Sequence, residues 1–152
     1  MKRTTSWNAG FTLLEMLVVM AIIGIIVAVG LPSFRTWQLR TVIENAAQQF
    51  ARDIDNQRIE AKRLNTSQVI RVVNLSSYKV GTVTKTMPPG TTVVLNNTAT
   101  MPNPLRFDPP YGTTVSNPPS SILPRYTIGS TADSSIFRTV SVVSLLGKVI
   151  VK

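Results

Sequence analysis

The chain has 152 residues, with sixteen Lys and Arg against seven Asp and Glu, which gives a formal net charge of +9. This length has room for one membrane helix and one domain, because domains usually hold about 100 to 150 residues. The sequence contains neither cysteine nor histidine. Disulfides and thiol chemistry are therefore excluded, and the usual general base is missing. We expect no catalytic site, cofactor or metal site, whereas the basic balance favours polyanions such as nucleic acid and anionic lipid.

An apolar run follows a short basic leader that contains Lys2 and Arg3. From Phe11 to Leu31 there are twenty-one residues with Glu15 as the one charged side chain, close to the roughly 20 residues that cross a bilayer as a helix. The two leader cations fit the positive-inside rule. The sequence therefore predicts a single membrane helix in contact with lipid.

Glu15 needs an explanation, because a carboxylate within a membrane helix is costly. Near the start of the helix the acid meets the positive end of the helix dipole and unpaired backbone N–H groups. One interpretation is therefore a helix-capping acid. The alternative requires a cation, and cleavage of the chain after Gly10 would create one at the new amine of Phe11.

The string Gly10–Glu15, followed by an apolar helix and Pro32, closely resembles the N-terminus of type IV pilins and pseudopilins. The resemblance implies that a prepilin peptidase cleaves between Gly10 and Phe11 and methylates the amine of Phe11. It also implies that Glu15 pairs with the Phe11 amine of a neighbouring subunit during assembly. The implied partners are other pilin subunits, the peptidase and the inner-membrane assembly platform.

Pro32 is the third residue that we assign to assembly. Proline lacks an N–H and crowds the preceding turn, so it should bend or locally open the helix. The resemblance implies more, since the corresponding segment of many pilins loses helical order in the filament. Gly24 and Gly30 weaken the helix further, or serve only to ease close helix packing.

Beyond Pro32 an apolar stripe at helical spacing predicts that the helix continues to about Leu64. The stripe consists of Leu39, Ile43, Ala46, Phe50, Ile54, Ala61 and Leu64. The other faces carry four cations and three acids, namely Arg52, Arg58, Lys62 and Arg63 with Asp53, Asp55 and Glu60. We interpret Asp53 and Asp55 as solvent-facing partners of Arg52 and Arg58.

Beyond the helix, segments rich in β-branched and aromatic residues are separated by short runs of turn-forming residues, as in an antiparallel sheet. The predicted strands are 69–73, 78–83, 91–95, 139–145 and 148–152, with the last two forming a hairpin around Leu146 and Gly147. Residues 101–124 hold seven of the ten prolines. We expect a long surface loop there, with a short strand near Leu105–Phe107.

These elements predict an α+β fold of the pilin type, in which a long N-terminal helix packs on an antiparallel sheet. We expect a leader at 1–10, a membrane and assembly helix at 11–34 and an exported head at 35–152. The resemblance implies a single-pass inner-membrane protein with its head in the periplasm before assembly into a filament.

The head also resembles minor pilins and pseudopilins of the FimT and GspH type. This second resemblance lies in three segments, 58–65, 137–143 and 147–149. Some members bind DNA through a terminal Gly-Arg-x-Arg turn, where this chain has Gly-Lys-Val-Ile at 147–150. Two arginines of that motif are therefore absent.

Alternation along the last strand still places Lys148 and Lys152 on one face. The pair is a candidate for contact with DNA phosphates, helped by Arg138 or Arg125 if folding brings either to the same edge. Charged side chains that discourage edge-to-edge strand pairing explain the same lysines.

The sequence thus indicates a minor pilin that enters or primes a type IV pilus, with DNA uptake as a candidate role. The alternative is a minor pseudopilin of a type II secretion system. A third interpretation is a binding domain or enzyme tethered by the helix. A plain tether requires neither Glu15 nor the leader junction, so the structural-subunit interpretation is favoured.

Overall fold

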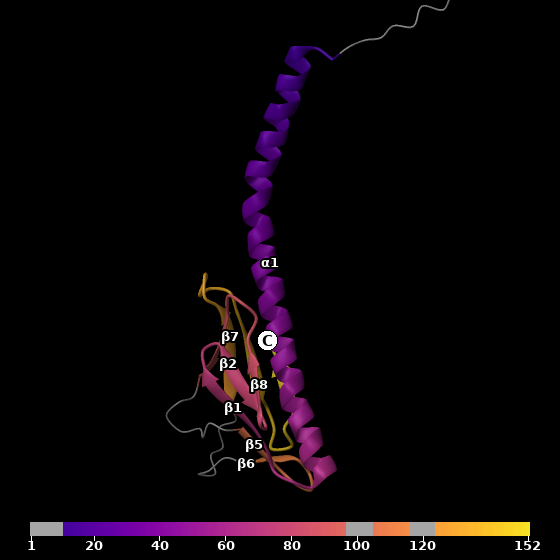
Figure 1. The fold of residues 1–152 in the computed structure, drawn as a ribbon, viewed down its shortest axis with the longest axis vertical. Helices are drawn as coiled ribbons and strands as arrows, with labels where there is room; N and C mark the ends of the chain where they lie inside the picture. The colour runs from indigo at the N-terminus through magenta and orange to yellow at the C-terminus, as the bar shows by residue number, and fades with distance from the viewer. Residues whose placement is uncertain (1–10, 97–104, 116–123) are drawn as a thin grey trace, which may run out of the picture. The chain divides into compact units, whose positions relative to one another are not determined.

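The computed structural model describes residues 11–96, 105–115 and 124–152, and the predicted leader lies outside them. Two compact units divide the chain, Met1–Trp37 and Gln38–Lys152. The helix α1 (Leu13–Leu64) has residues in both units, and Figure 1 shows it in indigo to magenta. The described strands are β1 (Gln68–Asn74), β2 (Ser77–Val80), β3 (Val83–Thr86), β4 (Thr91–Leu95), β5 (Leu105–Asp108), β6 (Thr113–Val115), β7 (Arg125–Ser130), β8 (Phe137–Val142) and β9 (Val149–Val151).

The first unit is helical and exposes its apolar side chains, from Leu13 to Trp37. By length and composition α1 can cross a membrane, as the sequence predicts. Pro32 lies inside the helix, and the hydroxyl of Thr36 donates to the carbonyl of Pro32 over 3.2 Å. Of the two effects predicted for this proline, local opening of the helix is not observed.

In the second unit α1 buries one stripe of small and large apolar side chains. The buried members are Ile43, Ala46, Ala47, Phe50, Ala51, Ile54 and Ala61. The predicted stripe is therefore confirmed, except that Leu64 is exposed and Leu39 is only partly buried. The helix ends at Leu64. The next residue, Asn65, has a positive φ of 52°, a conformation that is common just after a helix and that asparagine tolerates.

The strands form two antiparallel sheets in place of the single predicted sheet. The orders are β3-β2-β1-β5-β6 and β4-β7-β8-β9. In Figure 1 the second half of α1 runs alongside the strands. Both sheets contribute buried side chains to one core, which includes Ile70, Tyr78, Leu105 and Phe107 from the first and Val93, Tyr126, Ile128, Val140 and Val142 from the second. The predicted α+β class with a helix on antiparallel strands is confirmed.

The sequence prediction differs from the structure at one strand that is divided in two and at two strands that were not predicted, β6 and β7. The predicted strand 78–83 is divided into β2 and β3 by a turn at Gly81, which has a φ of +59°. Strand β7 was not predicted, although it pairs with both β4 and β8 at the centre of its sheet. The short strand near Leu105–Phe107 and the final hairpin are confirmed as β5 and as β8 with β9.

Phe50 and Asp53 fix the inner face of α1. The Phe50 ring packs edge-on against Tyr78 and Tyr126, with ring centroids 4.8 and 5.0 Å away. One turn later, Asp53 is 6% exposed and accepts hydrogen bonds from the Tyr78 hydroxyl over 2.7 Å and from Lys85 Nζ over 2.6 Å. Burial, with the bond to Asp53, raises the pKa of Tyr78, which therefore remains a neutral donor.

The predicted solvent-facing role of Asp53 is therefore wrong. Its partners come from β2 and β3 rather than from Arg52 on the same helix. Asp55 is partly exposed, and its carboxylate makes no hydrogen bond or ion pair within the described residues. The sequence shows two similar acids two positions apart, but only one of them points into the core.

We expect Asp53→Ala to destabilise the head by about 3 kcal/mol, because it leaves a half-buried ammonium and a buried hydroxyl without their acceptor. Asp55→Ala is the matched control and should change the free energy of unfolding by no more than about 0.5 kcal/mol. Urea unfolding of residues 38–152, which contain every buried apolar side chain of the described chain, measures both. Equal losses would contradict a structural role for the buried carboxylate.

Candidate functional site

The start of α1 is closed by reciprocal hydrogen bonds between Thr12 and Glu15. The Thr12 backbone N–H and hydroxyl both donate to Glu15 Oε2, over 2.9 and 3.0 Å. In return, the Glu15 backbone N–H donates to Thr12 Oγ1 over 3.2 Å. This is a capping box, which satisfies backbone donors that the first helical turn leaves unpaired. The capping interpretation of Glu15 therefore has a geometric basis.

The capping box leaves one oxygen of Glu15 available. All of the contacts that its carboxylate makes within the described residues use Oε2. Phe11, the residue before the box, is 74% exposed. Capping holds the carboxylate close to the end of the helix, and an ammonium from another molecule could approach Oε1 without breaking the cap.

On the second unit, the candidate cations Arg125, Lys148 and Lys152 lie on one face of the four-stranded sheet. Ser141 on β8 pairs with Arg125 on β7 and with Ile150 on β9. Because paired residues project to the same side of a sheet, Arg125, Ser141 and Ile150 share a face. Lys148 and Lys152 lie two residues either side of Ile150, and alternation places them on that face as well. All three cations are exposed.

No acidic residue occurs in any of the four strands of this sheet. The rest of the face is neutral, since the positions next to the cations are occupied by Thr127, Thr139 and Ile150. A sheet face with three exposed cations and no acid has a positive potential and can attract anions.

Arg138 lies on the opposite face of the same sheet. It pairs with the buried Ile128, and its Nε donates to Glu44 Oε2 on α1 over 2.5 Å. This hydrogen bond is the main cause that lowers the pKa of Glu44, and a second bond from Gln48 contributes. The structure thus brings Arg125 together with the two lysines and directs Arg138 to the helix.

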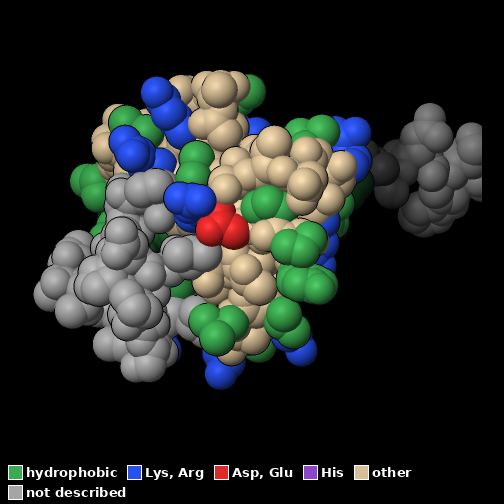
Figure 2. Space-filling view, turned by 90° about the horizontal axis from the view of Figure 1, so that it is seen from below, with side chains coloured by type: hydrophobic (Ala, Val, Ile, Leu, Met, Phe, Trp, Pro, Cys, Tyr) green, Lys and Arg blue, Asp and Glu red, His purple; other side chains and the backbone are tan. Residues whose placement is uncertain are grey.

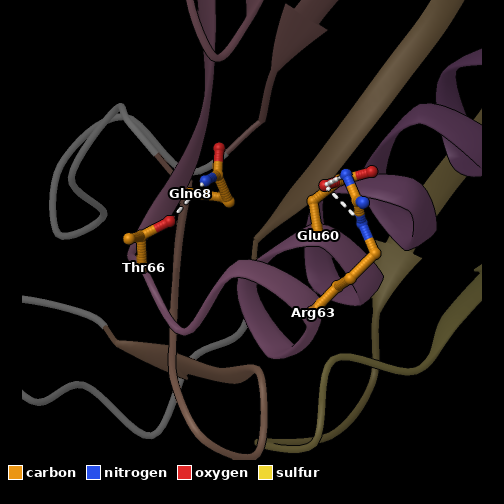
Figure 3. Close-up of polar contacts among 4 residues, drawn as sticks. All are labelled: Glu60, Arg63, Thr66 and Gln68. Atoms are coloured by element: carbon orange, nitrogen blue, oxygen red, sulfur yellow. Dashed lines mark hydrogen bonds and ion pairs between the residues drawn. The ribbon is translucent and has the colours of Figure 1, made fainter.

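The last turn of α1 carries two further cations, Lys62 and Arg63. Figure 3 shows that Arg63 is paired with Glu60, from Nη2 to Oε2 over 2.8 Å and from Nε over 3.2 Å. The same view shows Thr66 and Gln68 bonded to each other where the chain leaves the helix for β1. Of this pair of cations, Lys62 is the one that forms no ion pair with an acid of the described residues.

Arg58 holds two turns against the helix, a contact that the sequence analysis missed. Its Nη1 donates to the carbonyl of Leu146 in the β8–β9 turn over 2.8 Å. Gly147 and Gly112 both have positive φ, and a Cβ added at either would lie 2.8 Å from the Arg58 side chain. Only glycine fits such positions without displacement. The sequence shows that each of the two turns contains a glycine, Gly112 or Gly147. It does not show that either glycine lies next to Arg58.

Residues 8–31 match the family described as the prokaryotic N-terminal methylation motif. This segment includes Gly10, Phe11 and Glu15. No curated protein matches the chain in sequence.

Two solved structures are similar to the chain, both of the type IV minor pilin FimU of Pseudomonas aeruginosa strain PAO1 in different crystal forms. The first has a TM-score of 0.58 at 16% identity and covers 74% of this chain and 90% of that one. The second has a TM-score of 0.55 at 15% identity, and the match covers 72% of this chain and 91% of the FimU chain. At this identity the likeness shows the fold. The predicted pilin-type fold is therefore confirmed, and the motif with the two structures supports the resemblance to type IV minor pilins.

Proposed function

We propose that the chain is a minor pilin subunit that enters or primes a type IV pilus. The observation that carries the proposal is the joint occurrence of the methylation motif at 8–31 and a head with the fold of FimU. A methylation motif alone marks only the N-terminus, and a fold alone hosts many functions. Together they favour a subunit whose helix is used for assembly.

The proposal includes processing and location. A prepilin peptidase removes residues 1–10, cleaves between Gly10 and Phe11 and methylates the new amine. The apolar part of α1 anchors the subunit in the inner membrane, with the head in the periplasm until the assembly platform transfers it to the filament. The support is the exposed apolar surface of α1, which water does not solvate well.

For Glu15 we propose two simultaneous contacts. Oε2 remains in the capping box with Thr12, and Oε1 receives the Phe11 amine of a neighbouring subunit. In the low-dielectric bilayer an unpaired carboxylate and an unpaired ammonium are both unfavourable. Pairing them between subunits would favour assembly over the separate state.

A structural role is favoured over catalysis. The chain lacks His and Cys, and the two similar structures are both minor pilins. The alternative is a minor pseudopilin of a type II secretion system, which would share the leader, helix and head. Neighbouring genes for pilus or competence proteins would favour the first role, and neighbouring secretion genes the second.

A second proposed function is contact with DNA. It is favoured by the face that carries Arg125, Lys148 and Lys152, because lysines act as point charges toward phosphates and an arginine can bind a phosphate through two hydrogen bonds. Arg138 is not included among the proposed DNA contacts, because its charge is neutralised by the ion pair with Glu44. Such contact would be independent of base sequence and could serve DNA uptake.

The processing prediction is that the mature chain begins at Phe11 with a methylated amine. Mass spectrometry of the protein extracted from membranes measures this, and retention of Met1 or Lys2 would contradict it. A bulky substitution such as Gly10→Leu should block cleavage and leave the leader attached. Normal processing of that variant would exclude Gly10 as the cleavage position.

The assembly prediction separates pairing from capping. Glu15→Val removes both the cap and the intersubunit partner, so the protein should remain in the membrane while its recovery in filaments falls at least about tenfold. Thr12→Val is the matched control, because it removes the capping hydroxyl and keeps the carboxylate. Filaments and membranes are separated by shearing and quantified by immunoblot.

If pairing with the Phe11 amine drives assembly, the recovery in filaments should fall much less for Thr12→Val than for Glu15→Val. A similar loss in both variants would reduce Glu15 to a capping residue. Full assembly of Glu15→Val would remove this carboxylate from the mechanism.

The DNA prediction uses residues 35–152 and a fluorescent duplex, with binding followed by anisotropy over a salt series. The affinity should fall with salt by a slope of roughly 0.9 per neutralised phosphate. Lys148→Ala with Lys152→Ala should lower the slope by about 0.9 for each contact removed. Arg71→Ala with Lys79→Ala is a matched control on the other sheet. No binding at low salt would exclude DNA, and equal slopes in all three proteins would exclude this face.

A further inference from the structure

Two turns of the head present large apolar side chains to solvent. Tyr111, in the β5–β6 turn, is 70% exposed, and Leu145 and Leu146, in the β8–β9 turn, are 65% and 63% exposed. Figure 2 views the head from below relative to Figure 1 and shows several hydrophobic side chains on this face, with Lys and Arg side chains toward its edges and an acidic side chain next to a basic one near its centre. Apolar side chains gathered at one place in this way mark interaction surfaces.

Hydrogen bonds hold the two turns together. The backbone N–H and hydroxyl of Thr114 both donate to the carbonyl of Leu145, over 2.9 and 3.3 Å. Arg58 binds the carbonyl of the next residue, Leu146. The backbone that carries Leu145 and Leu146 is thus held by hydrogen bonds in the free protein, which reduces the ordering cost of binding.

Three cations lie at the two turns. Arg58 lies between the two turns, Lys62 contacts the position of Gly112 through its Cε, and Lys148 follows the β8–β9 turn. None of the three forms an ion pair with an acid of the described chain. An apolar centre with an aromatic residue and a polar border is typical of protein interfaces.

The charges of the head argue against a second copy as the partner. Thirteen Lys and Arg and six Asp and Glu lie in residues 38–152, so the side-chain balance is 13 − 6 = +7. Four of the acids are already in ion pairs, namely Glu44 with Arg138, Asp53 with Lys85, Glu60 with Arg63 and Asp108 with Arg106. Asp133 accepts two hydrogen bonds from Ser135, which leaves Asp55. Two such heads would therefore repel each other.

We propose that this surface, the hairpin patch, binds the acidic head of a different subunit in the same filament. The hairpin patch consists of Tyr111, Leu145 and Leu146 with Arg58, Lys62 and Lys148. The proposal rests on the assignment of the chain as a pilin subunit. It adds a docking surface and the chemistry of the neighbour, which presents apolar side chains edged by unpaired carboxylates.

The test uses the full-length chain in its native host, where the partners are present. The chain has no cysteine, so Leu146→Cys offers a single attachment point for a maleimide-benzophenone photo-cross-linker. Val83→Cys, on β3 and 60% exposed, is the matched control. Mass spectrometry identifies the adducts.

The expected result is an adduct from position 146 at a yield at least about fivefold above position 83, as expected when one patch dominates a contact. The partner should be a different protein with a prepilin-type N-terminus and a head of negative side-chain balance. An adduct with a second copy of the chain, a partner with a basic head, or equal yields at both positions would overturn the proposal.

A second set of variants tests the chemistry of the patch. Leu145→Ser with Lys62→Glu, in the Leu146→Cys background, should lower the adduct yield about tenfold, because it removes apolar area and reverses a bordering charge. Val83→Ser with Lys79→Glu makes the same changes elsewhere and should leave the yield within about twofold. Circular dichroism and the mass of the processed chain check that each variant folds and matures. An unchanged yield in a folded Leu145→Ser, Lys62→Glu protein would refute the patch.

Failure of the patch and failure of the pilin assignment give different results. If filament recovery depends on Glu15 but position 146 yields no pilin adduct, the chain is a pilin subunit that docks elsewhere. If the leader is retained and filaments do not contain the chain, the assignment itself is wrong, and the patch proposal falls with it.

Discussion

The head depends on the contact between one stripe of α1 and the inner faces of two sheets. Phe50 lies between Tyr78 of one sheet and Tyr126 of the other, so a single side chain joins all three elements. Small residues at Ala46 and Ala47 let the strands approach the helix closely. Before residue 38 the same helix exposes an apolar surface suited to lipid. One helix therefore has an apolar surface for a bilayer in its first part and an apolar stripe for a protein core in its second part.

That division explains what the sequence could predict. The apolar run, the stripe from Ile43 to Ala61 and the final hairpin have local periodicities that need no tertiary information. Strand β7 was missed because it begins directly after Pro124 and contains Gly129, both of which discourage strand prediction. The split into two sheets depends on pairing between distant strands, such as β1 with β5, and no local pattern encodes it.

The candidate sites divide in a similar way. Thr12 and Glu15 are three residues apart, so their reciprocal contact follows from helix geometry. Arg125 and Arg138 could not be separated from sequence, because the face that each occupies depends on the register of β7 against β8. A shift of one residue would exchange the faces of a strand. The core position of Asp53 depends in the same way on where Tyr78 and Lys85 arrive.

The pairing of the acids determines how the head meets its surroundings. Four ion pairs within the head match four cations to four acids, which leaves 13 − 4 = 9 cations against 6 − 4 = 2 acids in residues 38–152. In the apolar run from Phe11 to Leu31, by contrast, Glu15 is the one charged side chain. A contact between helices in the membrane would then depend on one carboxylate that requires a cationic partner. Contacts of the head would depend on cations that bind carboxylates or phosphates. A basic head is complementary to an acidic neighbour and is repelled by an identical head, which is the physical reason for the proposal that the chain assembles next to different subunits.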